Sequence, residues 1–288
     1  MKRGVYTVYQ ILNRRKVNTI LPKRKLDAHK GDMGKILLLC GSIGYTGAAE
    51  MAALGALRSG AGLVYLGVPT SIYEIMATKL SVPVVFPLVD HDGMLCDDAL
   101  QTIGAHLNRA DAVLIGPGLG ISVGTEHVVK NVLESFNGPV VLDADGITVM
   151  SKHKNILRER TGTTVLTPHE GEFSRFTGER ILDRKRDAEK LADELGCVVV
   201  LKGHKTVITD GVETYINMTG NPGMAVGGSG DVLAGIITSL IGQGISPLTA
   251  AACGAWLHGA AGDICAREIG QYGMIPKDLL HVLPRLMK

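Results

Sequence analysis

The chain has 288 residues and a formal net charge of +2, and 45% of its residues are hydrophobic. This length suits one large α/β domain or two small domains, and the apolar fraction is ample for a core. The nearly neutral charge and an aromatic content of only 4% argue against a nucleic-acid-binding protein, which needs basic charge or stacking side chains. No apolar run reaches the ~18 residues of a membrane helix, so we expect no membrane partner.

The amino-terminal segment is basic. Its first 26 residues include eight Lys or Arg residues and no acid, a composition that faintly resembles a mitochondrial transit peptide. We instead predict an ordinary amphipathic helix over Thr7–Arg15. The five cysteines are far apart and form no C-x-x-C pair, which favours buried, reduced thiols and a cytoplasmic location over a disulfide framework or a zinc site.

From Lys35 onward, short apolar segments alternate with helical segments. Most apolar segments lack alternation with polar residues, as expected for strands that helices cover on both faces. The predicted strands are residues 35–40, 63–69, 82–88, 112–116, 139–145, 163–168, 197–202 and 206–211. The predicted helices between them include residues 48–59, 123–136 and 181–195. This repetition predicts right-handed crossovers and a mostly parallel sheet.

The carboxyl-terminal third has a different pattern. Residues 206–218 read as two strands around Asp210-Gly211, which is a hairpin signal, and a helix rich in small residues follows at 250–261. Because there is no linker or repeat, we predict a single three-layer α/β/α domain over residues 1–288. Ligands of such sheets bind beyond the carboxyl ends of the strands, so functional residues are expected just after each apolar segment.

The strongest candidate site is the segment G-G-S-G-D at residues 227–231, which leads directly into a predicted helix. Closely spaced glycines and a helix amino terminus together form a cradle for a phosphate group. Asp231 would repel that phosphate unless it takes part in the chemistry, which favours a base that removes a proton from an attacking hydroxyl. The alternative is that Asp231 only caps the helix, but a cap does not require the glycines.

Two lysine- or glycine-containing segments also follow predicted strands, and each is a weak signal alone. In K-G-H-K-T, residues 202–206, two lysines could meet phosphate charge, although such lysines are more often only solvated. The segment G-S-I-G-Y-T-G-A-A, residues 41–49, suits a dinucleotide or a phosphate, but it matches neither G-x-G-x-x-G nor a P-loop and could be a plain turn.

Three further segments lie at the same predicted sheet edge. The loop G-P-G-L-G at 116–120 leaves room for a ligand, and T-P-H-E-G-E-F at 167–173 places His169 there, although a lone histidine is more often structural. Asp143 and Asp145 end a predicted strand. They could hold a Mg²⁺–phosphate through water, or one of them could cap the next helix, and the sequence leaves both possibilities open.

The order and spacing of these segments resemble the ribokinase-like, or carbohydrate-kinase, superfamily through G-G-x-G-D. Within that superfamily, the chain resembles the NAD(P)H-hydrate dehydratases over nearly its whole length. The similar segments are residues 29–42, 46–62, 116–120, 142–147, 167–173, 201–206, 220–235 and 255–263. The family often has proline at the position of Glu170.

The resemblance implies a ribokinase-like fold and a nucleotide-dependent hydro-lyase. Such enzymes phosphorylate the C6 hydroxyl of the S-form of NADH or NADPH hydrate and then eliminate phosphate, which restores the cofactor. It implies that Asp231 is the catalytic base and touches the substrate, with further substrate contacts from Ala48, Gly118 and His169. The nucleotide contacts that it implies are Lys202, Gly203, His204, Lys205, Thr206, Gly227, Gly228, Ser229 and Gly230.

The same resemblance, with the chemistry, indicates the cofactors and assembly. The nucleotide is ADP or ATP, and Mg²⁺ is expected to bridge its phosphates, although no all-protein metal site is visible in the sequence. The chain lacks an appended epimerase domain, which favours a stand-alone type that uses ADP. The family suggests a homo-oligomer, specifically a homotetramer.

Two other functions remain open from the sequence. A small-molecule kinase for a vitamin alcohol or a sugar needs the same base and the same anion cradle, so G-G-S-G-D cannot separate it from a dehydratase. A non-catalytic nucleotide sensor is also conceivable, but binding alone gains nothing from an acid inside the cradle.

Overall fold

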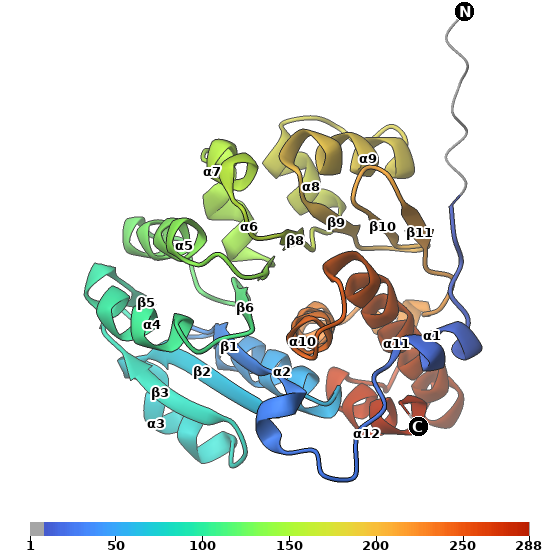
Figure 1. Cartoon of the computed structure of the whole chain (residues 1–288), viewed down its shortest axis with the longest axis horizontal. Coiled ribbons are helices and arrows are strands. Elements are labelled where there is room, and N and C mark those ends of the chain that lie inside the picture. The colour runs from blue at the N-terminus through green and yellow to red at the C-terminus, as the bar shows by residue number, and fades with distance from the viewer. Residues whose placement is uncertain (1–8, 288) are drawn as a thin grey trace, which may run out of the picture.

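The computed structural model describes residues 9–287, and its central feature is a nine-stranded sheet (Figure 1). The strand order is β11-β10-β9-β8-β7-β6-β1-β2-β3. The strands of this sheet are β1 (Lys35–Leu39), β2 (Leu63–Pro69), β3 (Val84–Leu88), β6 (Ala112–Ile115), β7 (Val140–Leu142), β8 (Thr164–Leu166), β9 (Val198–Leu201), β10 (Val207–Thr209) and β11 (Thr214–Ile216). A separate small hairpin pairs β4 (Asp90–His91) with β5 (Met94–Leu95).

The sheet is mostly parallel, as predicted. All pairs from β9 across to β3 are parallel, whereas β10 runs antiparallel to both β9 and β11. The predicted hairpin is therefore present. Its turn is stabilised by the Asp210 carboxylate, which accepts hydrogen bonds from the N–H groups of Val212 and Glu213 at 2.9 and 2.8 Å.

Helices cover both faces of the sheet. They are α1 (Arg14–Ile20), α2 (Thr46–Arg58), α3 (Thr70–Lys79), α4 (Leu100–Leu107), α5 (Val123–Ser135), α6 (Asp145–Met150), α7 (Lys154–Glu159), α8 (Glu170–Thr177), α9 (Arg184–Leu195), α10 (Ser229–Gly242), α11 (Pro247–Glu268) and α12 (Pro276–Leu286). Short 3₁₀ helices span Lys30–Met33, Asp97–Ala99 and Pro222–Met224.

The sheet separates two hydrophobic cores. Along β1, Ile36 and Leu38 pack against α2, α3 and α10–α12, whereas Leu37 and Leu39 pack against α4–α9. All four side chains are fully buried, which explains why this strand is continuously apolar. The green and yellow helices α5–α9 lie on one side of the sheet in Figure 1, and the orange and red helices α10–α12 lie on the other. This arrangement confirms the three-layer α/β/α fold.

Close packing of α2 against α10 brings the amino termini of both helices to one edge of the sheet. A methyl group at Gly235 would lie 2.1 Å from the carbonyl oxygen of Ala52, and one at Gly55 would lie 2.6 Å from that of Val232. Only glycine leaves room for two helix backbones at this separation. The two glycines therefore help to place the G-G-S-G-D segment beside the glycine-rich turn that precedes α2.

The predicted amino-terminal helix over residues 7–15 was wrong for residues 9–13 and right for Arg14 and Arg15. Residues 9–13 are not helical, and Gln10 instead donates its N–H to the carbonyl oxygen of Thr214, beside β11, at 2.8 Å. The helix begins later, at Arg14, because the side chain of Asn13 accepts a hydrogen bond from the N–H of Lys16 and caps it. Residues 7 and 8 of the predicted helix lie outside the described residues.

None of the helices between residues 9 and 287 combines the length and the apolarity that crossing a bilayer requires.

Candidate active site

The glycine-rich loops predicted from the sequence are joined to one another at the carboxyl ends of the parallel strands. The hydroxyl of Ser42, after β1, donates to the carbonyl oxygen of Gly118, after β6, at 2.8 Å. The N–H of Gly120 donates to the carboxylate of Asp145, after β7, at 2.9 Å. Because three successive loops share hydrogen bonds, the structure brings these sequence-predicted segments into one site.

Ala48 and Gly118, both predicted to contact the substrate, are neighbours. Gly118 has a φ of +62°, and a methyl group on it would lie 2.9 Å from the Cβ of Ala48 and 2.8 Å from that of Tyr45. A side chain at position 118 would therefore be strained and would clash with the start of α2. The structure gives a physical reason for glycine here.

Asp231 lies in the first turn of α10, and it does not cap the helix. The cap position is Gly228, with a φ of +93° and no side-chain cap bond, and Asp231 is three residues further on. The capping alternative is therefore wrong. The pKa of Asp231 is raised to about 6. Burial is the largest cause and the nearby carboxylate of Asp143 the second, whereas the cation of Lys202 lowers the pKa.

Lys202 is joined to acids from two neighbouring loops. Its ammonium lies 2.7 Å from a carboxylate oxygen of Asp143 and 3.7 Å from one of Glu172. The hydroxyl of Thr167 donates to the same oxygen of Asp143 at 2.7 Å. The side chains of Lys202 and Asp143 are only 18% and 2% exposed, so this is a buried ion pair. Burial disfavours the ammonium, but the two carboxylates outweigh it and raise the pKa of Lys202.

The ammonium of Lys202 also faces the anion cradle, because a methyl group at Gly230 would lie only 3.4 Å from it. The site thus combines the carboxylate of Asp231, a fixed cation and the glycine-rich start of a helix. These are the components that phosphoryl transfer from a nucleotide to a hydroxyl requires.

His169 has a structural role that the sequence left open. Its Nδ1 accepts hydrogen bonds from the N–H groups of Gly171 and Glu172, while the carboxylate of Glu172 accepts one from the N–H of His169 at 2.8 Å. This reciprocal pattern is a capping box at the start of α8. The cap fixes the ring, whose Nε2 lies 3.5 Å from a carboxylate oxygen of Glu172, while the side chain of His169 remains 54% exposed.

The loop after β9 is exposed and held in an unusual conformation. Gly203 and Lys205 have φ values of +144° and +56°, and the hydroxyl of Thr206 donates to the carbonyl oxygen of Gly203 at 2.9 Å. His204 and Lys205 lie on the surface, where a ligand can reach them. Lys202 differs from them because its side chain turns inward toward Asp143.

Sequence reasoning missed Arg184, which supports this loop. Its guanidinium donates to the carbonyl oxygens of Leu201 and Lys202 at 2.9 and 3.2 Å, and it forms an ion pair with Glu170. It thereby connects the K-G-H-K-T and T-P-H-E-G-E-F segments. Position 184 gives no signal in the sequence, because its helix looks like any charged surface helix.

His258 was also missed as an individual residue. It lies on α11, and its Nε2 is 3.2 Å from the hydroxyl of Ser229 in the cradle. Burial lowers the pKa of His258 to about 4, so the ring is neutral near pH 7. The segment around His258 contributed to the family resemblance, but only the fold shows that it contacts Ser229.

Neither Asp143 nor Asp145 caps α6, because the cap position is Ala144. That alternative is therefore wrong. Burial raises the pKa of Asp145, and its carboxylate faces the loop at Gly120. Within residues 9–287, no group of three or more His, Cys, Asp or Glu side chains is arranged to hold a metal ion.

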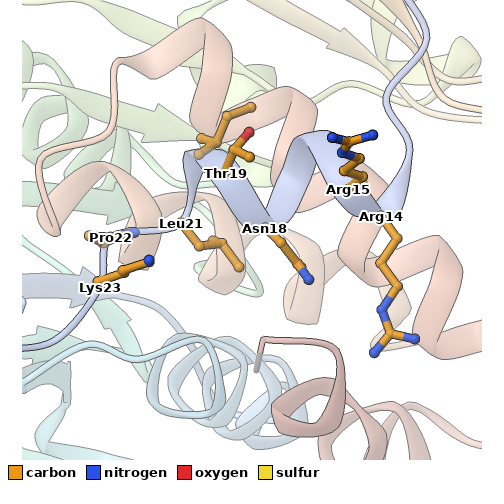
Figure 2. A pocket seen from close by; sticks show the side chains of 8 residues that line it. Arg14, Arg15, Asn18, Thr19, Leu21, Pro22 and Lys23 are labelled. Carbon is orange, nitrogen blue, oxygen red and sulfur yellow. The ribbon is translucent and has the colours of Figure 1, made fainter.

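A hollow on the described surface lies elsewhere. It has a volume of about 960 Å³ and is lined by α1 and the turn after it, as Figure 2 shows. Its lining residues, Arg14, Arg15, Asn18, Thr19, Ile20, Leu21, Pro22 and Lys23, include none of the residues around Asp231. This hollow is therefore separate from the loops around Asp231.

Comparisons with known proteins agree with the geometry. The sequence model of the NAD(P)H-hydrate dehydratase family matches residues 36–285. The bifunctional NAD(P)H-hydrate repair enzyme of Moorella thermoacetica is 44% identical over 93% of this chain and 52% of its own length. That of Escherichia coli is 35% identical over 99% of this chain and 53% of its own length. The chain thus spans about half the length of these curated relatives.

A solved structure extends the similarity to nearly all of both chains. The ADP/ATP-dependent NAD(P)H-hydrate dehydratase from Bacillus subtilis, co-crystallised with ATP and Mg²⁺, is 30% identical, with a TM-score of 0.82 and 98% of each chain covered. A ribokinase-like superfamily protein from Enterococcus faecalis is 27% identical, with a TM-score of 0.83. With the family model matching most of its length, the chain belongs to the NAD(P)H-hydrate dehydratase family.

Proposed function

We propose that this protein is a hydro-lyase that uses an adenine nucleotide to convert the S-form of NADH or NADPH hydrate back to NADH or NADPH. The observation that carries the proposal is the placement of Asp231, a half-buried acid whose pKa desolvation raises to about 6, inside a glycine-rich anion cradle. Family membership supplies the substrate.

In the proposed reaction, Asp231 accepts the proton of the C6 hydroxyl while the hydroxyl oxygen attacks the terminal phosphorus of the nucleotide. The bond from that phosphorus to the nucleotide breaks, and the N–H groups of residues 227–230 stabilise the charge on the transferring group. The C6–O bond then breaks with help from the lone pair of the ring nitrogen. Loss of the C5 proton restores the double bond, and phosphate is released.

The other residues bind and orient the reactants. Ala48, Gly118 and His169 contact the hydrate, and His204, Lys205 and Thr206 contact the nucleotide from the exposed loop after β9. Lys202 has a more specific role, because Asp143 holds its ammonium beside Gly230. We propose that it is a fixed cation that faces the phosphoryl group.

The proposed nucleotide is ADP, which would leave as AMP, bound with Mg²⁺. The relative from Bacillus subtilis was co-crystallised with ATP and Mg²⁺. Of the two acids Asp143 and Asp145, Asp145 fits a Mg²⁺ ion that keeps most of its ligands as water and phosphate oxygens, since one carboxylate suffices for such an ion and Asp143 is buried and bonded to Lys202 and Thr167. Bound there, Mg²⁺ would neutralise charge on the phosphates.

We also propose that residues 1–288 form one domain that assembles as a homotetramer in the cytoplasm, as the family resemblance suggests. All five cysteines are free thiols, and four of them are buried, which is consistent with a reducing compartment.

The pH dependence should report the base. We expect kcat/KM to fall as pH drops below about 6, because Asp231 must be ionised to accept a proton and burial raises its pKa to about 6. Glu172→Gln removes a negative charge that raises this pKa and keeps a side chain that can complete the capping box, so the acidic limb should move to lower pH. A limb near pH 4 in the parent, or no movement in the variant, would contradict this assignment.

The activity itself is tested by absorbance at 340 nm, with purified protein, NADH hydrate, Mg²⁺ and either ADP or ATP. We expect a rise that requires nucleotide, and the faster nucleotide identifies the donor. If nucleotide binds but absorbance does not rise with either hydrate, the proposal is wrong and a kinase for another alcohol takes its place. A stable phosphorylated product would identify that kinase.

A further inference from the structure

Two lysines from distant parts of the chain share one covered carboxylate beside α2. Glu50, on α2, lies 2.7 Å from the ammonium of Lys277, in the first turn of α12, and 3.5 Å from that of Lys79, the last residue of α3. The ammonium of Lys79 also donates to the hydroxyl of Thr46 at 3.3 Å. We call these three charged residues the Glu50 cluster.

The Glu50 cluster borders the proposed active site. Met51 and Pro276, the chain neighbours of Glu50 and Lys277, both flank the cradle, because a methyl group at Gly228 would lie 3.3 Å from a carbon of each. On the other side, Thr46 begins α2 two residues before Ala48, a proposed substrate contact. The Glu50 cluster therefore lies next to both the anion cradle at residues 227–230 and the start of α2.

The charges of the Glu50 cluster do not cancel. Two ammonium groups and one carboxylate leave a net charge of +1. The side chain of Glu50 is 11% exposed, whereas those of Lys79 and Lys277 are 39% and 53% exposed, so the cations face solvent and the anion is covered. Lys79 links α3 to α2 and Lys277 links α12 to α2, and the uncompensated positive charge at this exposed rim suits an anionic ligand.

We propose that Lys79 and Lys277 bind a phosphate group of the dinucleotide hydrate, which rests on the proposed function. Both hydrates carry a diphosphate, and the NADPH form adds a 2′-phosphate. Lysine binds phosphate as a point charge without strict geometry, which suits a flexible side chain at the rim of a site. Glu50 is the positioning residue that keeps both ammonium groups at this edge.

The test compares Lys79→Gln, Lys277→Gln and the double variant with the parent protein. Glutamine removes the charge but can still donate a hydrogen bond to Glu50. We expect KM for the hydrate to rise roughly two- to fivefold for each lysine, the range for exposed charge pairs, with kcat and KM for the nucleotide unchanged. Lys25→Gln, in the exposed turn after α1, is the matched control and should leave KM for the hydrate unchanged.

The two hydrates distinguish the two phosphate sources. A similar rise in KM with NADH hydrate and NADPH hydrate identifies the diphosphate, and a rise with NADPH hydrate alone identifies the 2′-phosphate. An unchanged KM for both hydrates in the double variant would overturn the proposal. If the unfolding temperature of that variant fell while KM stayed unchanged, the Glu50 cluster would only hold the helices together.

A binding measurement separates this proposal from the proposed function. NADPH, the expected product, is titrated into each protein, and its fluorescence gives Kd without any turnover. If the parent protein binds NADPH but does not act on the hydrates, the proposed function fails while the role of the lysines is still measured. Equal Kd values for the parent and the double variant would overturn the role of the lysines even in an active enzyme.

Discussion

Asp231→Asn is expected to lower kcat by about 10²- to 10⁴-fold, the usual cost of losing a general base, while nucleotide binding stays close to that of the parent. Asparagine has nearly the same shape and keeps the first turn of α10 intact, because the cap of this helix is Gly228 and not Asp231. Steady-state rates at 340 nm, with nucleotide affinity measured by calorimetry, give the two quantities separately.

Asp193→Asn is the matched control for this variant. It makes the same chemical change at an exposed acid near the end of α9, and we expect its kcat to equal that of the parent. If Asp231→Asn kept the activity of the parent protein, Asp231 could not be the base. A loss of nucleotide binding together with activity would instead place Asp231 in nucleotide recognition.

Lys202→Met is expected to destabilise the fold by about 3–5 kcal/mol, the typical cost of removing one partner from a buried ion pair. The carboxylate of Asp143 is 2% exposed, so it would lose its cation without gaining access to water. Turnover should also fall, because the substitution removes the cation beside Gly230. Urea unfolding gives the change in free energy, and assays below the unfolding transition give kcat.

Two further variants show whether burial is the cause. Lys190→Met breaks an ion pair with Glu179 in which both side chains are more than half exposed, so its effect on stability should be much smaller. Adding Asp143→Asn to Lys202→Met removes the stranded charge and should recover stability without recovering activity. If Lys202→Met were as stable as Lys190→Met, the ion pair would not hold the site together.

The sequence alone determined the features that depend on local pattern. The apolar segments predicted a mostly parallel sheet, and all eight of them contain strands of the central sheet, with boundaries that differ by at most three residues. The exceptions are β10, which is antiparallel, and β3, which is only partly buried. The hairpin around Asp210-Gly211 was also predicted, because asparagine, aspartate and glycine turns leave a short-range signal. The glycines at 227–230 indicated an anion cradle for the same reason, since a helix start after glycines is a local feature.

Only the tertiary structure decided which side chains meet. Asp143, Thr167 and Lys202 each follow the end of a strand, but they are far apart in the sequence. They become neighbours because β7, β8 and β9 are adjacent and parallel, and no periodicity in the sequence reports strand order. The contact between His258 and Ser229 likewise depends on how α11 packs against α10.

The misplaced amino-terminal helix has the same kind of explanation. Its residues have a helical pattern, but Gln10 pairs beside β11, more than 200 positions away in the sequence, and Asn13 then caps a later helix. Local propensity is a weak preference that a single tertiary contact can override. The sequence therefore identified the candidate functional residues. The fold decided which residues they contact, and these contacts set the pKa of Asp231 and turn the side chain of Lys202 inward.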